Sequence, residues 1–88
     1  MKNLSDVSEI RKKSISYILF LLENELIHAV AQGKDSFVFT ISIDFTSDVQ
    51  DTLLNANYTF NIRPAMEKLS EFSYVKSDKF VEIEIKLK

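Results

Sequence analysis

The sequence has no cysteine and no tryptophan, and it has only one glycine, one proline and one histidine. Without cysteine the chain can form no disulfide and offers no thiol nucleophile, a composition that fits a reducing compartment. The single glycine, Gly33, excludes the phosphate-binding loop and the dinucleotide fingerprint, because both need several glycines. The enzyme classes that these motifs define are therefore excluded.

An excess of positive charge is also missing. Eleven Lys and Arg residues stand against 13 Asp and Glu residues, so the formal net charge is −2 and gives no overall attraction to nucleic acid or anionic lipid. The longest apolar stretch, from Ile15 to Leu22, covers about eight residues, whereas a membrane span needs roughly 20. No apolar run comes before Ile15, so we do not expect the segment that starts with Met1 to Leu4 to be a signal peptide. We expect a cytoplasmic protein without a membrane partner.

Helical periodicity dominates the first third of the chain. Asp6 and Glu9 have the spacing of a capping box, and Gly33 can take the left-handed conformation that ends a helix. Between them, apolar side chains recur at helical spacing: Ile15, Ile18, Leu19, Leu22, Leu26, Ala29 and Val30. The pattern predicts one long helix.

Two segments alternate between apolar and polar residues, which is typical of strands. They run from Phe37 to Phe45 and from Phe80 to Leu87. Between them, Ser47 and Gln50 predict the start of a short helix that Asn55 to Asn57 would end.

A further, shorter strand is predicted between these two, from Tyr58 to Arg63. Pro64 should end it, because proline has no backbone N–H to donate to a neighbouring strand. We favour a third helix from Pro64 to Ser73, although Phe72 to Lys76 could instead pair with the last strand across a turn at Ser77 and Asp78. Residues 1–88 then form one two-layer α+β domain of order α-β-α-β-α-β, with the long helix on a three-stranded sheet.

The long helix is apolar on more than one side, and three short strands can hardly cover all of it. We expect the surplus face to bind a partner or a second copy of the chain. Its candidate residues are Tyr17, Phe20, Leu21, Asn24 and His28. The alternative is a central helix wrapped by its own domain.

The sheet face away from the helices is predicted to be polar. Its candidate docking residues are Asp44, Asn61, Arg63, Glu82 and Glu84. Because antiparallel sheets commonly leave one face in water, a solvated face without a partner is the favoured interpretation.

Reactive chemistry has few candidates. His28 is the only side chain suited to act as a general base at neutral pH, and no nucleophile motif accompanies it. Asp44, Asp48 and Asp51 are acidic, but Asp48 and Asp51 follow a helix start, where carboxylates complement the helix dipole. We therefore expect no metal, no cofactor and no enzymatic activity.

A resemblance to a known group of proteins is carried by three features in a row. They are the helix end Ala29-Val30-Ala31-Gln32-Gly33-Lys34, the strand after it, and the short helix that leads into Asn57-Tyr58. From Ile18 to Ile62 the chain resembles small accessory proteins of bacteriophages that infect low-GC Gram-positive bacteria, although Asn57 stands where glycine is expected. The resemblance implies a protein that binds and redirects or inhibits one host protein.

These observations favour a non-enzymatic interaction module, expected to be a homodimer, whose partner is a host protein. One alternative is a nucleic-acid-binding regulator using Arg63 and the basic run Arg11-Lys12-Lys13, to which Lys2 would add. Another is a structural subunit of a phage particle or larger assembly.

Overall fold

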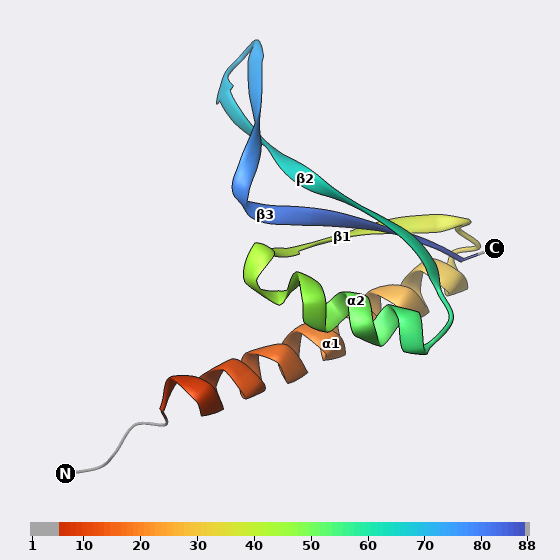
Figure 1. The fold of residues 1–88 in the computed structure, drawn as a ribbon. Helices are drawn as coiled ribbons and strands as arrows, with labels where there is room; N and C mark the ends of the chain where they lie inside the picture. Colours follow the sequence, from red (N-terminus) through yellow and green to blue (C-terminus); the bar gives the residue numbers. More distant parts are fainter. Residues whose placement is uncertain (1–5, 88) are drawn as a thin grey trace.

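A computed structural model describes residues 6–87. The order of elements is α1 (Val7–Ala31), β1 (Ser36–Ser42), the short 3₁₀ helix η1 (Ile43–Phe45), α2 (Thr46–Asn55), β2 (Thr59–Ser70) and β3 (Ser73–Lys86). Both α-helices lie against the same face of the sheet, and the first half of α1 extends beyond it (Figure 1). The α+β class and the long helix on a three-stranded sheet are confirmed.

Local sequence accounts for both ends of α1. The Asp6 carboxylate accepts a hydrogen bond from the backbone N–H of Glu9 at 2.8 Å, which caps the first turn. At the other end Gly33 has a φ of 73°, and Lys34 N–H donates to the carbonyl of Ala29 at 3.0 Å. This is the Schellman arrangement, in which a left-handed residue closes the last turn.

The end of α2 repeats this arrangement. Asn57 has a φ of 64°, and Tyr58 N–H donates to the carbonyl of Leu53 at 3.0 Å. Asparagine tolerates the left-handed region better than most residues, so the chain can turn here without glycine. The expected helix end at Asn55 to Asn57 is confirmed.

The start of α2 differs from the prediction. The helix begins at Thr46 and its N-cap residue is Phe45, without a side-chain cap, so the predicted capping box of Ser47 and Gln50 does not form. The strand before it ends at Ser42, whose hydroxyl accepts from Asp44 N–H at 3.4 Å at the start of η1. The alternating pattern from Ile43 to Phe45 therefore continues in sequence but not in the sheet.

The sheet is antiparallel with the order β1-β3-β2. Its helix-facing side carries the core, which α1 and α2 complete from below. The core residues are Leu22, Phe39, Ile41, Val49, Leu53, Val81, Ile83 and Ile85. Ile83 and Ile85 lie on the central strand and are fully buried, so the sheet and both helices meet on β3.

A helix from Pro64 to Ser73 does not form. The segment belongs to β2, which pairs with β3 through a turn at residues 71–72, so the suggested turn at Ser77 and Asp78 is also wrong. Pro64 is tolerated because β2 is an edge strand, where the backbone groups on the outer edge have no neighbouring strand to bond to. The order is thus α-β-α-β-β, apart from η1.

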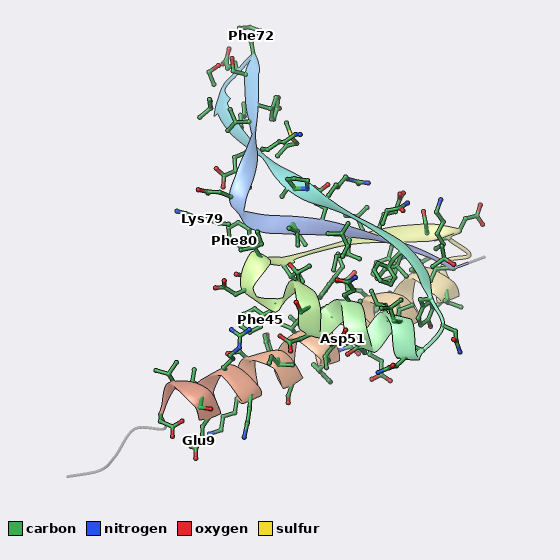
Figure 2. The ribbon with its side chains drawn as sticks, viewed as in Figure 1. Glu9, Phe45, Asp51, Phe72, Lys79 and Phe80 are labelled. Atoms are coloured by element: carbon green, nitrogen blue, oxygen red, sulfur yellow. The ribbon has the colours of Figure 1, made fainter. Side chains whose placement is uncertain are left out.

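Beyond Pro64 the β2–β3 hairpin bends away from the helices as a two-stranded arm (Figure 1). Pro64 pairs with Val81 and Met66 pairs with Lys76, so Ala65 alone stands opposite residues 77–80. Extra residues on one strand bend and twist a ladder. Lys79 and Phe80 lie at this bend, and Phe72 lies at the far end of the arm (Figure 2).

Candidate protein-interaction surface

The side of α1 opposite the sheet is exposed and largely apolar. Leu22 and Ala29 are the buried residues of α1. At 3.6 residues per turn, Tyr17, Phe20 and Ile27 point the other way, and they are 62%, 59% and 59% exposed. The helix therefore carries two apolar faces, of which its own domain covers one.

The exposed side chains follow a seven-residue repeat, which is the spacing of helices that pair with other helices. We call this row the outer seam of α1. It consists of Ile10, Lys13, Tyr17, Phe20, Asn24, Ile27 and Ala31. All seven are exposed, and the seam is apolar except at Lys13 and Asn24.

Each of the five residues expected at an interface is exposed on α1. Tyr17, Phe20 and Asn24 lie in the outer seam, whereas Leu21 and His28 flank it along one edge. The expectation did not include Ile10 and Ile27, which extend the row by about two turns before Tyr17 and by about one turn after Asn24. The seven-residue spacing was the signal that could have found them.

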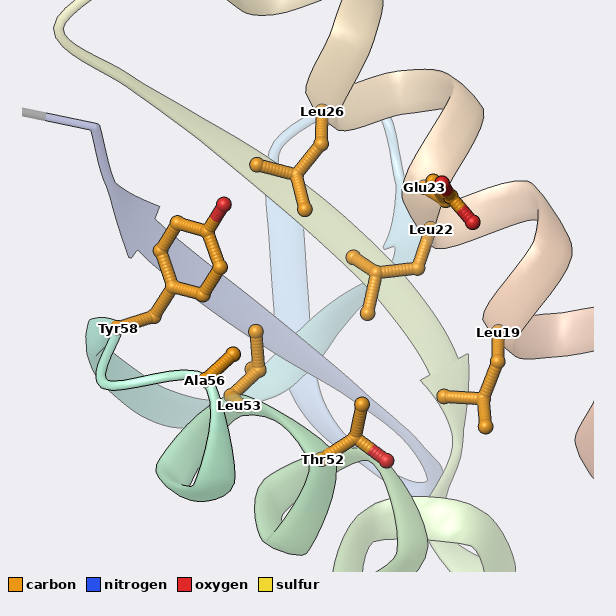
Figure 3. Close-up of a pocket in the computed structure, with 8 residues that line it drawn as sticks. All are labelled: Leu19, Leu22, Glu23, Leu26, Thr52, Leu53, Ala56 and Tyr58. Carbon is orange, nitrogen blue, oxygen red and sulfur yellow. The ribbon is translucent and has the colours of Figure 1, made fainter.

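Shallow apolar hollows lie beside α1, and one of them reaches the outer seam at Ile27 and Ala31. One, of ≈ 230 Å³, opens between the two helices, where Leu19, Leu22 and Leu26 face the α2 side (Figure 3). A second, of ≈ 440 Å³, shares Leu26 and Tyr58 with the first and continues to Ile27 and Val30. Such hollows can seat the side chains of a protein partner.

Arg11, in the first half of α1, contacts η1 and α2. Its guanidinium donates to the Asp44 carbonyl at 2.7 Å, lies 3.6 Å from an Asp48 carboxylate oxygen, and sits 4.9 Å from the centre of the Phe45 ring. These contacts span α1, η1 and α2. The position of the outer seam is thus set from both ends of the helix.

The predicted polar sheet face is present, but one of its five predicted residues lies elsewhere. Asn61 lies across from Glu84, and Arg63 across from Glu82. Arg63 donates to Glu82 at 3.0 Å and lies 3.7 Å from Glu84, so it offsets part of the negative charge of these two glutamates. Asp44 lies in η1 and is not part of the face.

The hairpin arm carries a second group of exposed apolar side chains, which sequence reasoning missed because this segment was expected to be helical. The group consists of Met66, Leu69, Phe72, Tyr74 and Val75. Phe72, at the tip, is 91% exposed. A protruding apolar tip of this kind is unusual on a solvated surface.

Among residues 6–87, no group of three or more His, Asp or Glu side chains could hold a metal ion. His28 lies exposed in the last turn of α1. By length and composition, α1 is also the one helix of residues 6–87 that could cross a membrane. The helix therefore has enough apolar side chains to pass this test, although the apolar stretch from Ile15 to Leu22 is short.

The candidate surface is defined by the exposed side chains of α1 alone. Comparison with protein-family models, curated proteins and solved structures gave no match.

Proposed function

We propose that this protein is a non-enzymatic protein-interaction module that acts through the outer seam of α1. The observation that carries the proposal is the row of half-exposed aromatic and aliphatic side chains on a helix whose opposite face is already packed. Aromatic anchors such as Tyr17 and Phe20 supply much of the binding energy of protein interfaces. A helix with such a face fits an apolar groove or another helix.

Four polar side chains of the described residues are used in the structure, which supports a non-enzymatic role. Asp6 caps a helix, Ser42 opens η1, and Ser77 serves the bend of β3. Arg63 pairs with glutamates across the sheet. These groups hold the fold together, and a catalytic site would need some of them to converge on a substrate instead.

The partner that we propose, following the resemblance to phage accessory proteins, is a host protein whose activity is redirected or inhibited when α1 covers part of its surface. We also propose that the protein acts in the cytoplasm. Glu23 and Glu25 lie within the apolar part of α1, and an acidic side chain at the bilayer centre costs about 2.5–3.5 kcal/mol. Leu22 and Ala29 are moreover used in packing.

A role in nucleic-acid binding has less support. Of the basic residues that it would use, Arg11 is engaged with Asp44 and Asp48, and Arg63 with Glu82. Lys2 lies outside the described residues. What remains is a small cationic footprint for phosphate binding.

The hairpin arm favours a second candidate, a structural subunit of a phage particle or larger assembly. Such a subunit needs two separate contact surfaces, and the arm supplies one that lies apart from α1. Mass that grows beyond a dimer with concentration, and that stops growing in Phe72→Ser, would support this role. Growth that Phe72→Ser leaves unchanged would count against it.

The experiment that tests the main proposal is capture of proteins from a Gram-positive bacterial lysate by the tagged protein and two variants. Phe20→Lys places a charge in the outer seam, and Leu54→Lys makes the same kind of change on α2 at a side chain of similar exposure, 55% against 59%. We expect a stoichiometric protein captured by the wild type and Leu54→Lys and lost from Phe20→Lys.

Two results would refute the proposal. One is equal capture by Phe20→Lys and the wild type, which would place the contact elsewhere. The other is recovery of nucleic acid that is released as salt rises, because counterion release makes phosphate binding salt-dependent.

A further inference from the structure

The outer seam of α1 has a pattern that fits a particular partner, a second copy of itself. We propose that two copies pair through this seam with their helices antiparallel. The inference rests on the proposed function, because it concerns the same face: the free protein is a reversible dimer, and a host protein replaces the second copy on the outer seam. Four observations carry it: the heptad spacing, the opposition of polar and apolar residues, the charge distribution and the available area.

Antiparallel pairing places apolar residues opposite apolar residues and polar residues opposite polar residues along the seam. In one register Ile10 lies opposite Ile27 of the second copy, and Tyr17 lies opposite Phe20 of the second copy. The two polar members, Lys13 and Asn24, then lie opposite each other, and the asparagine amide oxygen can accept from the lysine ammonium. Sliding one helix by a heptad would instead place Phe20 against Asn24, which loses this match.

The charge distribution favours the same orientation. Lys12 and Lys13 lie in the first half of α1, and Glu23 and Glu25 lie in the second half. An antiparallel pair places the basic half of each helix beside the acidic half of the other. A parallel pair in register would place Lys13 against Lys13 inside the seam, where like charges repel.

The exposed area is enough for a modest interface. With roughly 200 Å² for a large bare side chain, exposed fractions of 51% to 62% at Ile10, Tyr17, Phe20 and Ile27 leave about 460 Å² in one copy and about 920 Å² in two. Leu21 and Val30, which flank the seam, bring the total to about 1,300 Å². That is near the lower end of the range for specific interfaces, so we expect a reversible dimer.

Cysteine cross-linking tests both the pairing and its direction. The chain has no cysteine of its own, so each engineered thiol is the only one present. Ile10→Cys and Ile27→Cys change exposed residues, and both variants should keep the wild-type circular dichroism spectrum. Under mild oxidation we expect little cross-linking of either variant alone and a covalent dimer when the two are mixed.

The control is a mixture of Ile10→Cys with Leu54→Cys, which should not cross-link above the level of either alone. Efficient cross-linking of each seam variant with itself, but not with the other, would show a parallel pair and overturn the proposed orientation. Absence of cross-links in the mixture, with a monomeric mass for the wild type up to about 300 µM, would overturn self-pairing altogether.

Failure of this inference remains distinguishable from failure of the proposed function. A monomeric protein whose capture of a cellular partner is lost in Phe20→Lys would overturn self-pairing while leaving the interaction role in place. A monomeric protein whose capture does not change in Phe20→Lys would overturn both.

Discussion

Ser77 holds the bend at which the hairpin arm leaves the sheet, and its removal should have a measurable cost. The side chain is 7% exposed. Its hydroxyl accepts from the backbone N–H groups of Lys79 and Phe80, each at 3.1 Å, and donates to the Glu67 carboxylate at 2.8 Å. Ser77→Ala removes all three hydrogen bonds at once.

The expected cost can be worked from these contacts. A typical hydrogen bond contributes about 0.5–1.5 kcal/mol net, and a bond to a charged group contributes more. Water can reach the exposed carboxylate of Glu67, which lowers the penalty for that bond. We therefore expect Ser77→Ala to lower the free energy of unfolding by about 2 kcal/mol, which is large for a domain of marginal stability.

Urea denaturation followed by circular dichroism measures this change. With a slope of about 1–1.5 kcal/mol/M for a small domain, the midpoint should fall by roughly 1–2 M. Amide hydrogen exchange should accelerate at Lys79 and Phe80. The matched control is Ser73→Ala, which makes the same change at an exposed position of β3. A midpoint within about 0.3 M of the wild type, with unchanged exchange at both amides, would refute this role for Ser77.

Two further predictions concern the ends of α1. Gly33→Ala should cost about 1–2 kcal/mol, because its φ of 73° is unfavourable for alanine although no atom lies within 4 Å of the added methyl group, and Gly33→Asn should cost less; equal unfolding midpoints would contradict this. Arg11→Ala should cost about 1–2 kcal/mol and speed amide exchange in the first turns of α1, because it removes the contacts to Asp44 and Phe45; Arg11→Lys should recover only part of that loss.

The sequence was most informative where periodicity was regular. The long helix, its end at Gly33 and the strand from Phe80 onward were predictable because apolar spacing and a single left-handed residue define them. The outward face of α1 was predictable for a related reason. Three short strands can hardly cover two sides of a helix, so Tyr17 and Phe20 were expected to remain exposed, and they do.

The hairpin arm was not predictable from the same signals. Pro64 suggested the end of a strand, yet on an edge strand a missing donor is tolerated. The spacing of Met66, Leu69 and Phe72 suits a helix, whereas the structure exposes all three on a ribbon. The bend itself depends on Ser77 bonding to residues in both strands, which no local pattern in the sequence specifies.

The end of the first strand shows the same limit. Apolar and polar residues alternate as far as Phe45, but residues 43–45 form η1 and not strand. Contacts with the distant α1 hold them there, because Arg11 binds the Asp44 carbonyl and stacks over Phe45. A contact between residues this far apart in sequence has no signature in either segment alone. For this reason Asp44 was assigned to the polar sheet face and lies in η1 instead.

The most direct test of the central claim, that the outer seam of α1 is a contact surface between copies, is sedimentation velocity over about 1–300 µM. The wild type, Phe20→Lys and Leu54→Lys should be compared under the same conditions. We predict a concentration-dependent shift from monomer to dimer for the wild type and Leu54→Lys, and a monomer at every concentration for Phe20→Lys. A wild type that stays monomeric, or a Phe20→Lys variant that dimerises as the wild type does, would contradict the claim.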